Sequence, residues 1–422
     1  MQPYRPISAA ALGLAALVST TASAQTTLTL IHQYAPAATP QLEALLAPFE
    51  KAHDVKVELV RLTQGATPEK VVAMSAAGTA PDVVRLSSDQ TVQLARAGLV
   101  LPLDGFITAD KLDTRRWPDP IFHFSWFNEQ GHIYALPAGL SMQVIFYDKD
   151  AFKARGVDLP PAKWGGWDWA TFVADAKKMT YGENGQISHY GLFRFDGADG
   201  SPYMIGLWGQ QWVTPDLKHF RGTDPGLLEA ERHLIDLRLT DQVMPNVTQA
   251  PLTTGDGVLK GWASMEGIQN PVLPSFERST LNWDVAPLPQ GSTLASQAGL
   301  NQFVVPSGSK HAKLAWELVK YLTYDVDANR QLSDISGRIP ALIANGPHFV
   351  ERLNAQEAGF HAQVFTDATA YYWDMQVLDA LNAAAVGKLI NQALHNVLLG
   401  QKSLAGALAE VAPQADALLQ GE

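Results

Sequence analysis

The sequence predicts an α/β protein whose sheet is largely parallel and whose chain is divided between two lobes. Segments with the alternation of a strand are separated by segments with the apolar spacing of a helix, and this order repeats along the first part of the chain. The length of 422 residues also exceeds the roughly 250–300 residues that one hydrophobic core usually holds, which predicts two lobes. The third observation is a polar loop, Ser87-Ser88-Asp89, between a strand and a helix.

The first elements follow from hydrophobic spacing. Strands are expected at 26–31 and 55–60, and helices at about 40–52 and 67–77. A third strand at Val83-Val84 then leads through the polar loop into a helix that ends at Gly98. The loop therefore lies at the carboxyl end of a strand, where open α/β sheets bind ligands.

The later elements follow the same reasoning. A new block begins at 133–137, and the strand expected at 141–150 leaves the first lobe as a hinge that crosses to the second. The remaining expected elements are strands at 283–289 and 299–305, helices at 170–179, 227–239 and 313–322, and a helical region from Gln376 that is broken at Gly400.

The N-terminal residues have the pattern of a secretory signal peptide. Arg5 precedes an apolar run at 9–18, and Ala22-Ser23-Ala24 supplies a small-residue cleavage site. The apolar run is too short to span a bilayer, and no later segment offers about 18 uninterrupted apolar residues. We therefore expect residues 1–24 to be removed after Ala24 and the mature chain to be soluble.

The chain contains no cysteine, which excludes disulfides, thiolate chemistry and a lipidated N-terminal cysteine. A freely soluble periplasmic protein is the simplest interpretation, and full secretion stays open. Loss of Arg5 with the leader changes the formal net charge from −11 to −12, which argues against nucleic acid and anionic membranes as partners. The histidines are scattered, and the acids at 196–200 lack the later glutamate of a calcium loop, so no metal or other cofactor is expected.

Several ordered motifs along nearly the whole mature chain resemble one family. They include Pro81-Asp82-Val83-Val84, Tyr134-Ala135-Leu136-Pro137, Phe146-Tyr147-Asp148-Lys149-Asp150, Val285-Ala286-Pro287-Leu288-Pro289 and Ser309-Lys310 before Ala315-Trp316. In this order they resemble family 1 of the extracellular solute-binding proteins, the substrate-binding proteins of carbohydrate ABC transporters, which include maltose-binding protein.

The resemblance implies a type II periplasmic-binding-protein fold, with two interwoven α/β lobes, a hinge and a ligand cleft between them. The lobes would comprise 25–138 plus 300–338 and 139–299 plus 339–422. The family implies closure around a carbohydrate and delivery to a permease in the inner membrane. We expect a monomer with no catalytic activity.

Asp89 is the first candidate ligand residue, because it stands where family members place a sugar-binding acid. A carboxylate accepts two hydroxyl hydrogen bonds. The alternative is that Asp89 caps the following helix, and both roles could hold. Ser88 stands beside it in the loop.

His32, Gln33 and Tyr34 follow the first strand and Gln64 follows the second, so both loops should lie at one sheet edge. The family often has a Trp where Ile31 stands here, so a ligand role for these residues and ordinary loop polarity both stay open.

Further candidates are assigned by the resemblance to the crossings and to the second lobe. Ser141, with Gln143 nearby, falls at a hinge-side contact for which maltose-binding protein has an acid, so specificity should differ. The others are Glu266 and Gln269 in the second lobe and Gly299 and Asn301 at the second crossing.

Aromatic rings are expected to stack on the apolar faces of a sugar. Trp373, with Tyr371, stands where relatives place a stacking aromatic, and Tyr203 and Trp208 could form a second platform. Arg338 at the third crossing is either a ligand clamp or part of an ion pair between the lobes.

The sequence leaves three functions open. A neutral sugar, more specifically a di- or oligosaccharide, suits a neutral, aromatic and amide-rich site. The same fold could instead bind glycerol phosphate, a polyamine or iron. A secreted glycoside hydrolase would need paired carboxylates, for which Asp89 and Glu266 are the available residues.

Overall fold

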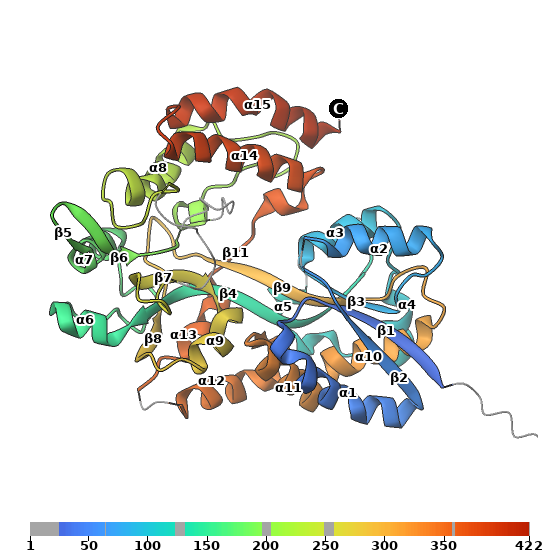
Figure 1. Ribbon diagram of the computed structural model, residues 1–422. Helices are drawn as coiled ribbons and strands as arrows, with labels where there is room; N and C mark the ends of the chain where they lie inside the picture. Colours follow the sequence, from blue (N-terminus) through green and yellow to red (C-terminus); the bar gives the residue numbers. More distant parts are fainter. Residues whose placement is uncertain are drawn as a thin grey trace, which may run out of the picture.

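The computed structural model describes residues 25–63, 65–122, 131–195, 204–248, 257–356 and 359–421. Two α/β lobes lie side by side and are joined by long strands that pass between them (Figure 1). The predicted α/β class and the two lobes are therefore confirmed. The proposed leader, residues 1–24, lies outside the described residues.

The N-terminal part of the chain builds most of one lobe. Its elements are β1 (Thr26–His32), η1 (Pro36–Ala38), α1 (Thr39–His53), β2 (Val55–Arg61), α2 (Thr67–Ala76), β3 (Val83–Leu86), α3 (Ser88–Arg96), α4 (Asp104–Asp110), η2 (Thr114–Arg116) and α5 (Asp119–Phe122). The six elements predicted before Gly98 are all present, and Gly98 has the positive φ of a helix stop.

The middle of the chain crosses between the lobes and builds much of the other. Its elements are β4 (Leu136–Asp148), α6 (Lys149–Arg155), α7 (Trp169–Met179), β5 (Tyr181–Glu183), β6 (Gln186–Leu192), η4 (Met204–Trp208), α8 (Pro225–Leu239), β7 (Ala263–Gln269), η5 (Asn270–Val272), α9 (Leu273–Glu277), β8 (Trp283–Ala286) and β9 (Ser296–Val304).

The C-terminal part adds helices to both lobes. Its elements are α10 (Ala312–Tyr324), α11 (Val326–Ser336), β10 (Ile339–Pro340), η6 (Ile343–Asn345), α12 (Gly346–Asn354), α13 (Gln363–Asp367), η7 (Ala368–Tyr371), β11 (Tyr372–Trp373), η8 (Gln376–Asp379), α14 (Ala383–Leu398) and α15 (Leu404–Gln420). Within the described ranges, no helix is both long and apolar enough to cross a membrane.

The sheet is mixed rather than largely parallel. Its main strand order is β2-β1-β3-β9-β4-β7-β6-β5, with β8 and β10 paired to β4 and β11 paired to β9. The parallel prediction holds for β1, β2 and β3, but β9 runs antiparallel to β3 and β4 runs antiparallel to β9 and β7. The antiparallel pairs arise where the chain passes back and forth between the lobes.

β4 is the main crossing strand. Residues Leu136 to Met142 pair with β9, whereas the residues from Gln143 onwards pair with β7 and β8 in the other lobe. The block at 133–137 and the strand at 141–150, predicted separately, are thus joined into one strand of 13 residues. Nearly all of its residues are buried, because helices cover it as it crosses.

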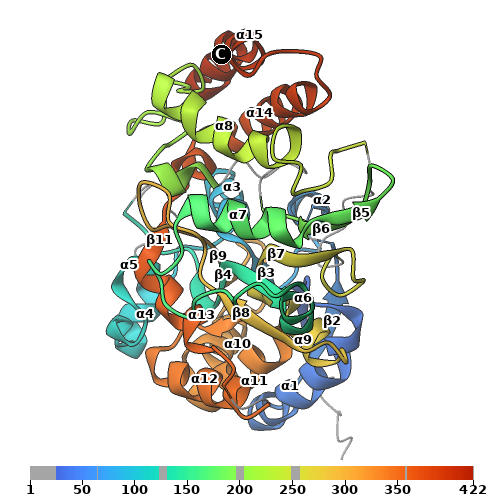
Figure 2. The same ribbon diagram turned by 90° about the vertical axis from the view of Figure 1, so that its left-hand side faces the viewer.

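The buried apolar side chains form two large clusters. One gathers around α1, α10 and the first strands and continues beneath the crossing to Phe146, Phe276 and Trp283. The other lies among α7, α8, α14 and α15. A smaller cluster packs α2 and α3 on the opposite face of β1 and β3. In Figure 2, α14 and α15 lie at the upper end of the second lobe and α12 lies at its lower end.

Candidate ligand-binding site

The site begins at the end of β1, which finishes at His32. The His32 ring is buried, and its Nδ1 accepts a hydrogen bond from the amide of Tyr34 at 3.3 Å. Burial, together with the charges of Arg61 and Arg85, lowers the pKa of His32 to about 4. The ring is therefore neutral at pH 7, and it holds the backbone turn that carries Tyr34.

Arg85 connects this turn to β9. Its Nε donates to Asn301 Oδ1 and its Nη1 donates to Gln33 Oε1, while Asn301 Nδ2 donates to the Tyr34 hydroxyl at 2.8 Å. Arg85 is 5% exposed, and burial lowers its pKa. The negative charge of Asp89 opposes this effect of burial. Its hydrogen-bond partners are thus neutral amides rather than a carboxylate.

Arg338 also lies over the Tyr34 ring. Its guanidinium carbon is 5.9 Å from the ring centroid, against 5.6 Å for Arg85. Burial and the charge of Arg85 lower the pKa of Arg338 to about 9, so it remains positively charged at pH 7. Its Nε is buried without a hydrogen-bond partner. No carboxylate pairs with Arg338 among the described residues, so the expected alternative of an ion pair between the lobes is not found there.

Asp89 lies in the first turn of α3 and is exposed. The residue that caps this helix is Ser87, whose amide donates to Gln90 Oε1 at 3.2 Å. Asp89 therefore does not cap the helix, and its carboxylate is available to other partners. Ser88 is buried beside it. Gln90 also accepts from Gln33 Nε2 at 3.1 Å, which ties the start of α3 to the turn after β1.

Small and amide side chains form a polar row along the crossing strands. Ser141 pairs with Gly299 across β4 and β9, and Gln143 pairs with Gln269 across β4 and β7. A Cβ atom on Gly299 would lie 3.7 Å from both Ser141 Cβ and Gln269 Nε2, so these groups surround one point. Gln143 itself is committed to the Gly267 carbonyl, to which its Nε2 donates at 3.0 Å.

Trp373 joins this row through β11. It pairs with Gln297 of β9. Gln297 is partly exposed, and it lies on the same strand face as Gly299, two residues further along. A Cβ atom on Gly206 would lie 2.4 Å from the Trp373 ring, so the ring packs directly on that glycine. Trp373 is partly exposed and is therefore accessible as a stacking surface.

The other aromatic candidates pack against protein. Tyr371 stacks on Trp164 with 4.9 Å between ring centroids, and Trp208 stacks on His233 at the same separation. Glu266 is fully buried in β7 and accepts from the amide of Val258 at 3.4 Å. It therefore lies within the second lobe and is not brought to the polar row. Gln64 and Tyr203 lie outside the described residues.

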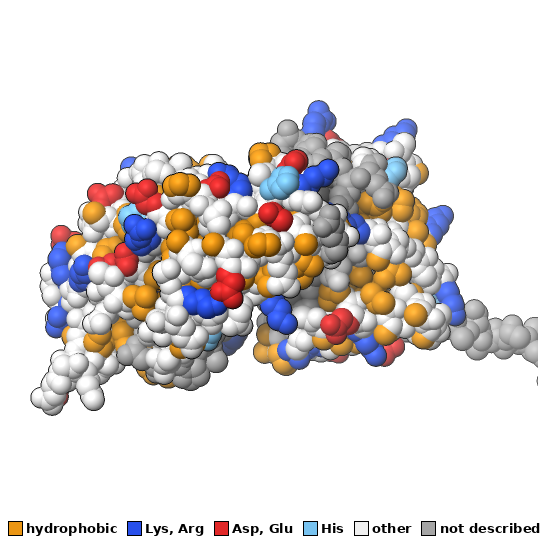
Figure 3. Space-filling model, turned by 90° about the horizontal axis from the view of Figure 1, so that it is seen from above, with side chains coloured by type: hydrophobic (Ala, Val, Ile, Leu, Met, Phe, Trp, Pro, Cys, Tyr) orange, Lys and Arg blue, Asp and Glu red, His pale blue; other side chains and the backbone are white. Residues whose placement is uncertain are grey.

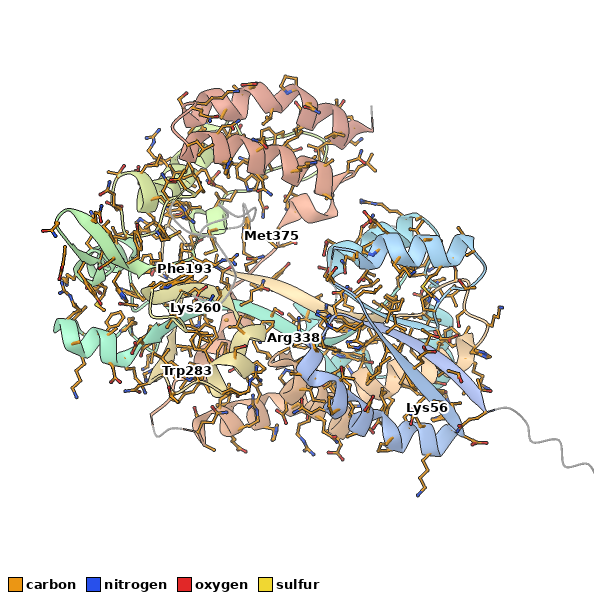
Figure 4. The ribbon with its side chains drawn as sticks, in the orientation of Figure 1. Lys56, Phe193, Lys260, Trp283, Arg338 and Met375 are labelled. Carbon is orange, nitrogen blue, oxygen red and sulfur yellow. The ribbon has the colours of Figure 1, made fainter. Side chains whose placement is uncertain are left out.

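Two cavities border these residues. One of about 500 Å³ has Gln33, Tyr34 and Arg338 on one wall and Pro271, Pro274, Ser275 and Arg278 on the other. Another of about 630 Å³ lies between α3, including Asp89 and Arg96, and the start of α14. Both volumes fall within the roughly 300–1,000 Å³ typical of ligand pockets. Figure 4 shows Arg338 where the strands pass between the lobes.

Sequence reasoning missed Arg85 and Gln297. The signal for Arg85 was its position inside the apolar strand Val83-Val84-Arg85-Leu86. An arginine is seldom buried unless it has specific partners. The signal for Gln297 was its position two residues before Gly299 and four before Asn301, since strand neighbours at even spacing share a face.

We compared the chain with known proteins. The family model described as bacterial extracellular solute-binding protein matches residues 35–325. A galactooligosaccharide-binding protein of Bacillus subtilis (strain 168) is 25% identical over 364 residues, which is 81% of each chain.

Solved structures share the fold. An ABC substrate-binding protein from Listeria monocytogenes in complex with cycloalternan has a TM-score of 0.81 at 21% identity, covering 93% of this chain and 98% of that chain. The maltose/maltodextrin-binding domain MalE from Bdellovibrio bacteriovorus bound to maltotriose has a TM-score of 0.76 at 18% identity, covering 94% and 100%. These likenesses confirm the two-lobed periplasmic-binding-protein fold.

Proposed function

Since the chain belongs to the bacterial extracellular solute-binding protein family, we propose that it is the substrate-binding component of an ABC importer that takes up a carbohydrate. The observation that carries this proposal is the polar row Ser141–Gly299–Gln269 with Trp373 alongside it. Amide and hydroxyl groups satisfy sugar hydroxyls, while an indole face packs on the C–H face of a sugar ring.

The ligand class is a di- or oligosaccharide built of neutral rings. The relative from Bacillus subtilis is a galactooligosaccharide-binding protein, and the two structural neighbours hold cycloalternan and maltotriose. Asp89, His32, Gln33, Tyr34, Asn301 and Arg338 are proposed to surround the sugar with the polar row. The lobes that close on it are 25–138 plus 300–338 and 139–299 plus 339–422.

The cellular setting is also part of the proposal. Residues 1–24 are removed as a signal peptide, the mature protein is periplasmic and not lipidated, and a permease in the inner membrane receives the ligand. The protein acts as a monomer and performs no catalysis. Glycerol phosphate, a polyamine and glycoside hydrolysis are the alternatives that the experiment must separate from sugar binding.

The test is a thermal-shift screen of residues 25–422 against mono-, di- and oligosaccharides, polyamines and glycerol phosphates, with product analysis of each incubation. A ligand that binds the native state alone raises the melting temperature. We expect a shift with a di- or oligosaccharide that is recovered intact, and loss of the shift in Asp89→Asn and Trp373→Ala. Cleaved sugar would identify an enzyme, and a shift with polyamine or glycerol phosphate alone would overturn the carbohydrate assignment.

A further inference from the structure

Two guanidinium groups meet in the site without an acid between them. Arg85 and Arg338 lie over the same tyrosine ring, at 5.6 and 5.9 Å from its centroid. Arg85 is satisfied by the amide oxygens of Gln33 and Asn301. Arg338 has no side-chain hydrogen bond to any of the residues that the structure describes, and its Nε is buried. Arg338 as a whole is half-buried, and a buried donor of a charged group is costly unless another molecule supplies its partner.

The acids nearest to this cavity are already committed. Asp334 and Glu277 line the same cavity as Arg338, but both pair with Arg352: its Nε lies 2.9 Å from Asp334 Oδ1 and its Nη1 lies 2.5 Å from Glu277 Oε1. His348 Nε2 is also 3.1 Å from Asp334 Oδ2. Within the described part of the chain, the two carboxylates of the cavity wall thus lie against Arg352 and form no ion pair with Arg338.

Arg338 has no charged partner among the described residues. Tyr34 and the exposed carboxylate of Asp89 raise the pKa of Arg85 against the effect of burial. Burial and the charge of Arg85 lower the pKa of Arg338. The side chain of Arg338 borders the cavity of about 500 Å³, where a ligand could supply the missing partner.

The remaining charge is local and does not extend over the surface. Seen from above in Figure 3, basic and acidic side chains are interspersed over both lobes. The chain as a whole is acidic, with a formal net charge of −11. This face therefore has no broad positive field to attract an anion, and recognition has to come from contact with the half-buried guanidinium of Arg338.

We infer that the carbohydrate carries one carboxylate, as a uronic acid unit does, and that Arg338 binds this carboxylate in the cavity beside Tyr34. The inference rests on the proposed carbohydrate-binding function and departs from it in one respect, because one unit of the di- or oligosaccharide is acidic and the other rings are neutral. The neutral rings occupy the polar row and Trp373, and the acidic unit occupies the cavity at the turn after β1.

The chemistry of the groups favours a carboxylate. A guanidinium offers donors only, in a planar fork that matches the two oxygens of a carboxylate. A neutral hydroxyl accepts a hydrogen bond from it but leaves the charge unbalanced.

The first experiment uses the wild-type mature chain and pairs of disaccharides. Each pair consists of an aldobiouronic acid, with glucuronate or galacturonate linked to one neutral sugar, and the same disaccharide after reduction of its carboxyl group to an alcohol. Affinities are measured by isothermal titration calorimetry, with glucose 6-phosphate and galactose 6-phosphate as a further arm. We expect the acidic member of one pair to bind at least about tenfold more tightly than its reduced counterpart.

The second experiment compares two arginines of the same cavity. Arg338→Gln removes the proposed carboxylate partner but keeps a polar side chain, and Arg278→Gln removes an exposed cation from the opposite wall. We expect the preference for the acidic sugar to be lost in Arg338→Gln and kept in Arg278→Gln. Circular dichroism and thermal melting verify that each variant is folded. If Arg338→Gln is not folded, the affinities of the wild-type chain for the acidic and reduced disaccharides decide the question.

The outcomes separate this inference from the function on which it rests. Three results overturn the inference. They are equal binding of the acidic and reduced members, binding of the reduced members alone, and no binding of any uronate at millimolar concentration. In the first two cases carbohydrate binding stands. A preference that persists in folded Arg338→Gln overturns the assignment to that residue. Binding of the sugar phosphates alone overturns the inference that the ligand carries a carboxylate. If no sugar binds, the proposed function itself is contradicted.

Discussion

Asn270 donates a hydrogen bond from its side-chain amide to the carbonyl oxygen of Gly337, 2.7 Å away. The same side chain accepts from the Met142 amide at 2.6 Å and donates to the Leu140 carbonyl at 3.3 Å. One buried amide therefore joins the start of η5, the middle of β4 and the chain just before β10, all at the junction between the lobes.

Asn270→Ala should lower the free energy of unfolding by about 2–4 kcal/mol. The substitution leaves the Met142 amide and the Gly337 carbonyl without these partners, and unpaired buried polar groups are costly. Urea unfolding measures the change. Asn354→Ala, at the exposed end of α12, is the control and should change stability by less than about 0.5 kcal/mol. Equal effects in the two variants would show that Asn270 does not hold the junction together.

Gly337→Ala should destabilise the protein by about 2–4 kcal/mol. Gly337 has a φ of +65°, and a Cβ atom there would lie 2.5 Å from Cδ of Pro274. Gly346 supplies the control, because nothing lies within 4 Å of a Cβ atom at that position and its φ is −55°. Thermal melting of both variants should show a large decrease for Gly337→Ala alone.

His32 should make the stability of the protein depend on pH between about 6.5 and 4. Its pKa falls from 6.5 in the unfolded chain to about 4 in the folded protein, so only the unfolded chain takes up this proton over that range. The free energy of unfolding therefore decreases as the pH is lowered, by roughly 3 kcal/mol from this residue.

The pH prediction is tested by denaturation at pH 7 and pH 4.5. His32→Gln retains an acceptor for the Tyr34 amide but cannot be protonated, so its loss of stability on acidification should be smaller than that of the wild type. His395→Gln, on the exposed side of α14, should behave as the wild type does. The same pH dependence in all three proteins would contradict the role assigned to burial of His32.

Gly206→Ala should weaken sugar binding although Gly206 is proposed to make no contact with the sugar. Its new methyl group would lie 2.4 Å from the ring of Trp373 and would force the indole out of position. Calorimetry should show at least about a tenfold loss of affinity if Trp373 stacks on the ligand. Gly346→Ala in α12 meets nothing within 4 Å and should leave affinity unchanged. Unchanged affinity in Gly206→Ala would argue against stacking on Trp373.

Local elements were predicted well because hydrophobic spacing determines them. The first three strands and the helices between them lie within one or two residues of expectation. The pairing of β4 and β9 could not be predicted in the same way. β4 is buried on both faces where it crosses, and β9 is buried on both faces from Leu300 onwards. An apolar run does not reveal the direction of its neighbours.

The site was only partly accessible to sequence reasoning. Polar residues at the ends of β1 and β3 were found because their sequence positions follow strands. The partners of Arg338 depend on contacts between segments more than 200 residues apart, such as Tyr34 and the chain before β10. Tyr371 likewise stacks on Trp164, more than 200 residues away, and no motif shows that Trp208 stacks on His233.

The continuous β4 has a consequence for how this protein can be divided. Its first half completes the pairing of β9 and its second half completes the pairing of β7 and β8. A fragment cut at the midpoint of β4 would leave an unpaired edge in each half, and such edges favour aggregation. Neither lobe should therefore be obtainable as an independent folding unit, and folding of the two should be a single cooperative event.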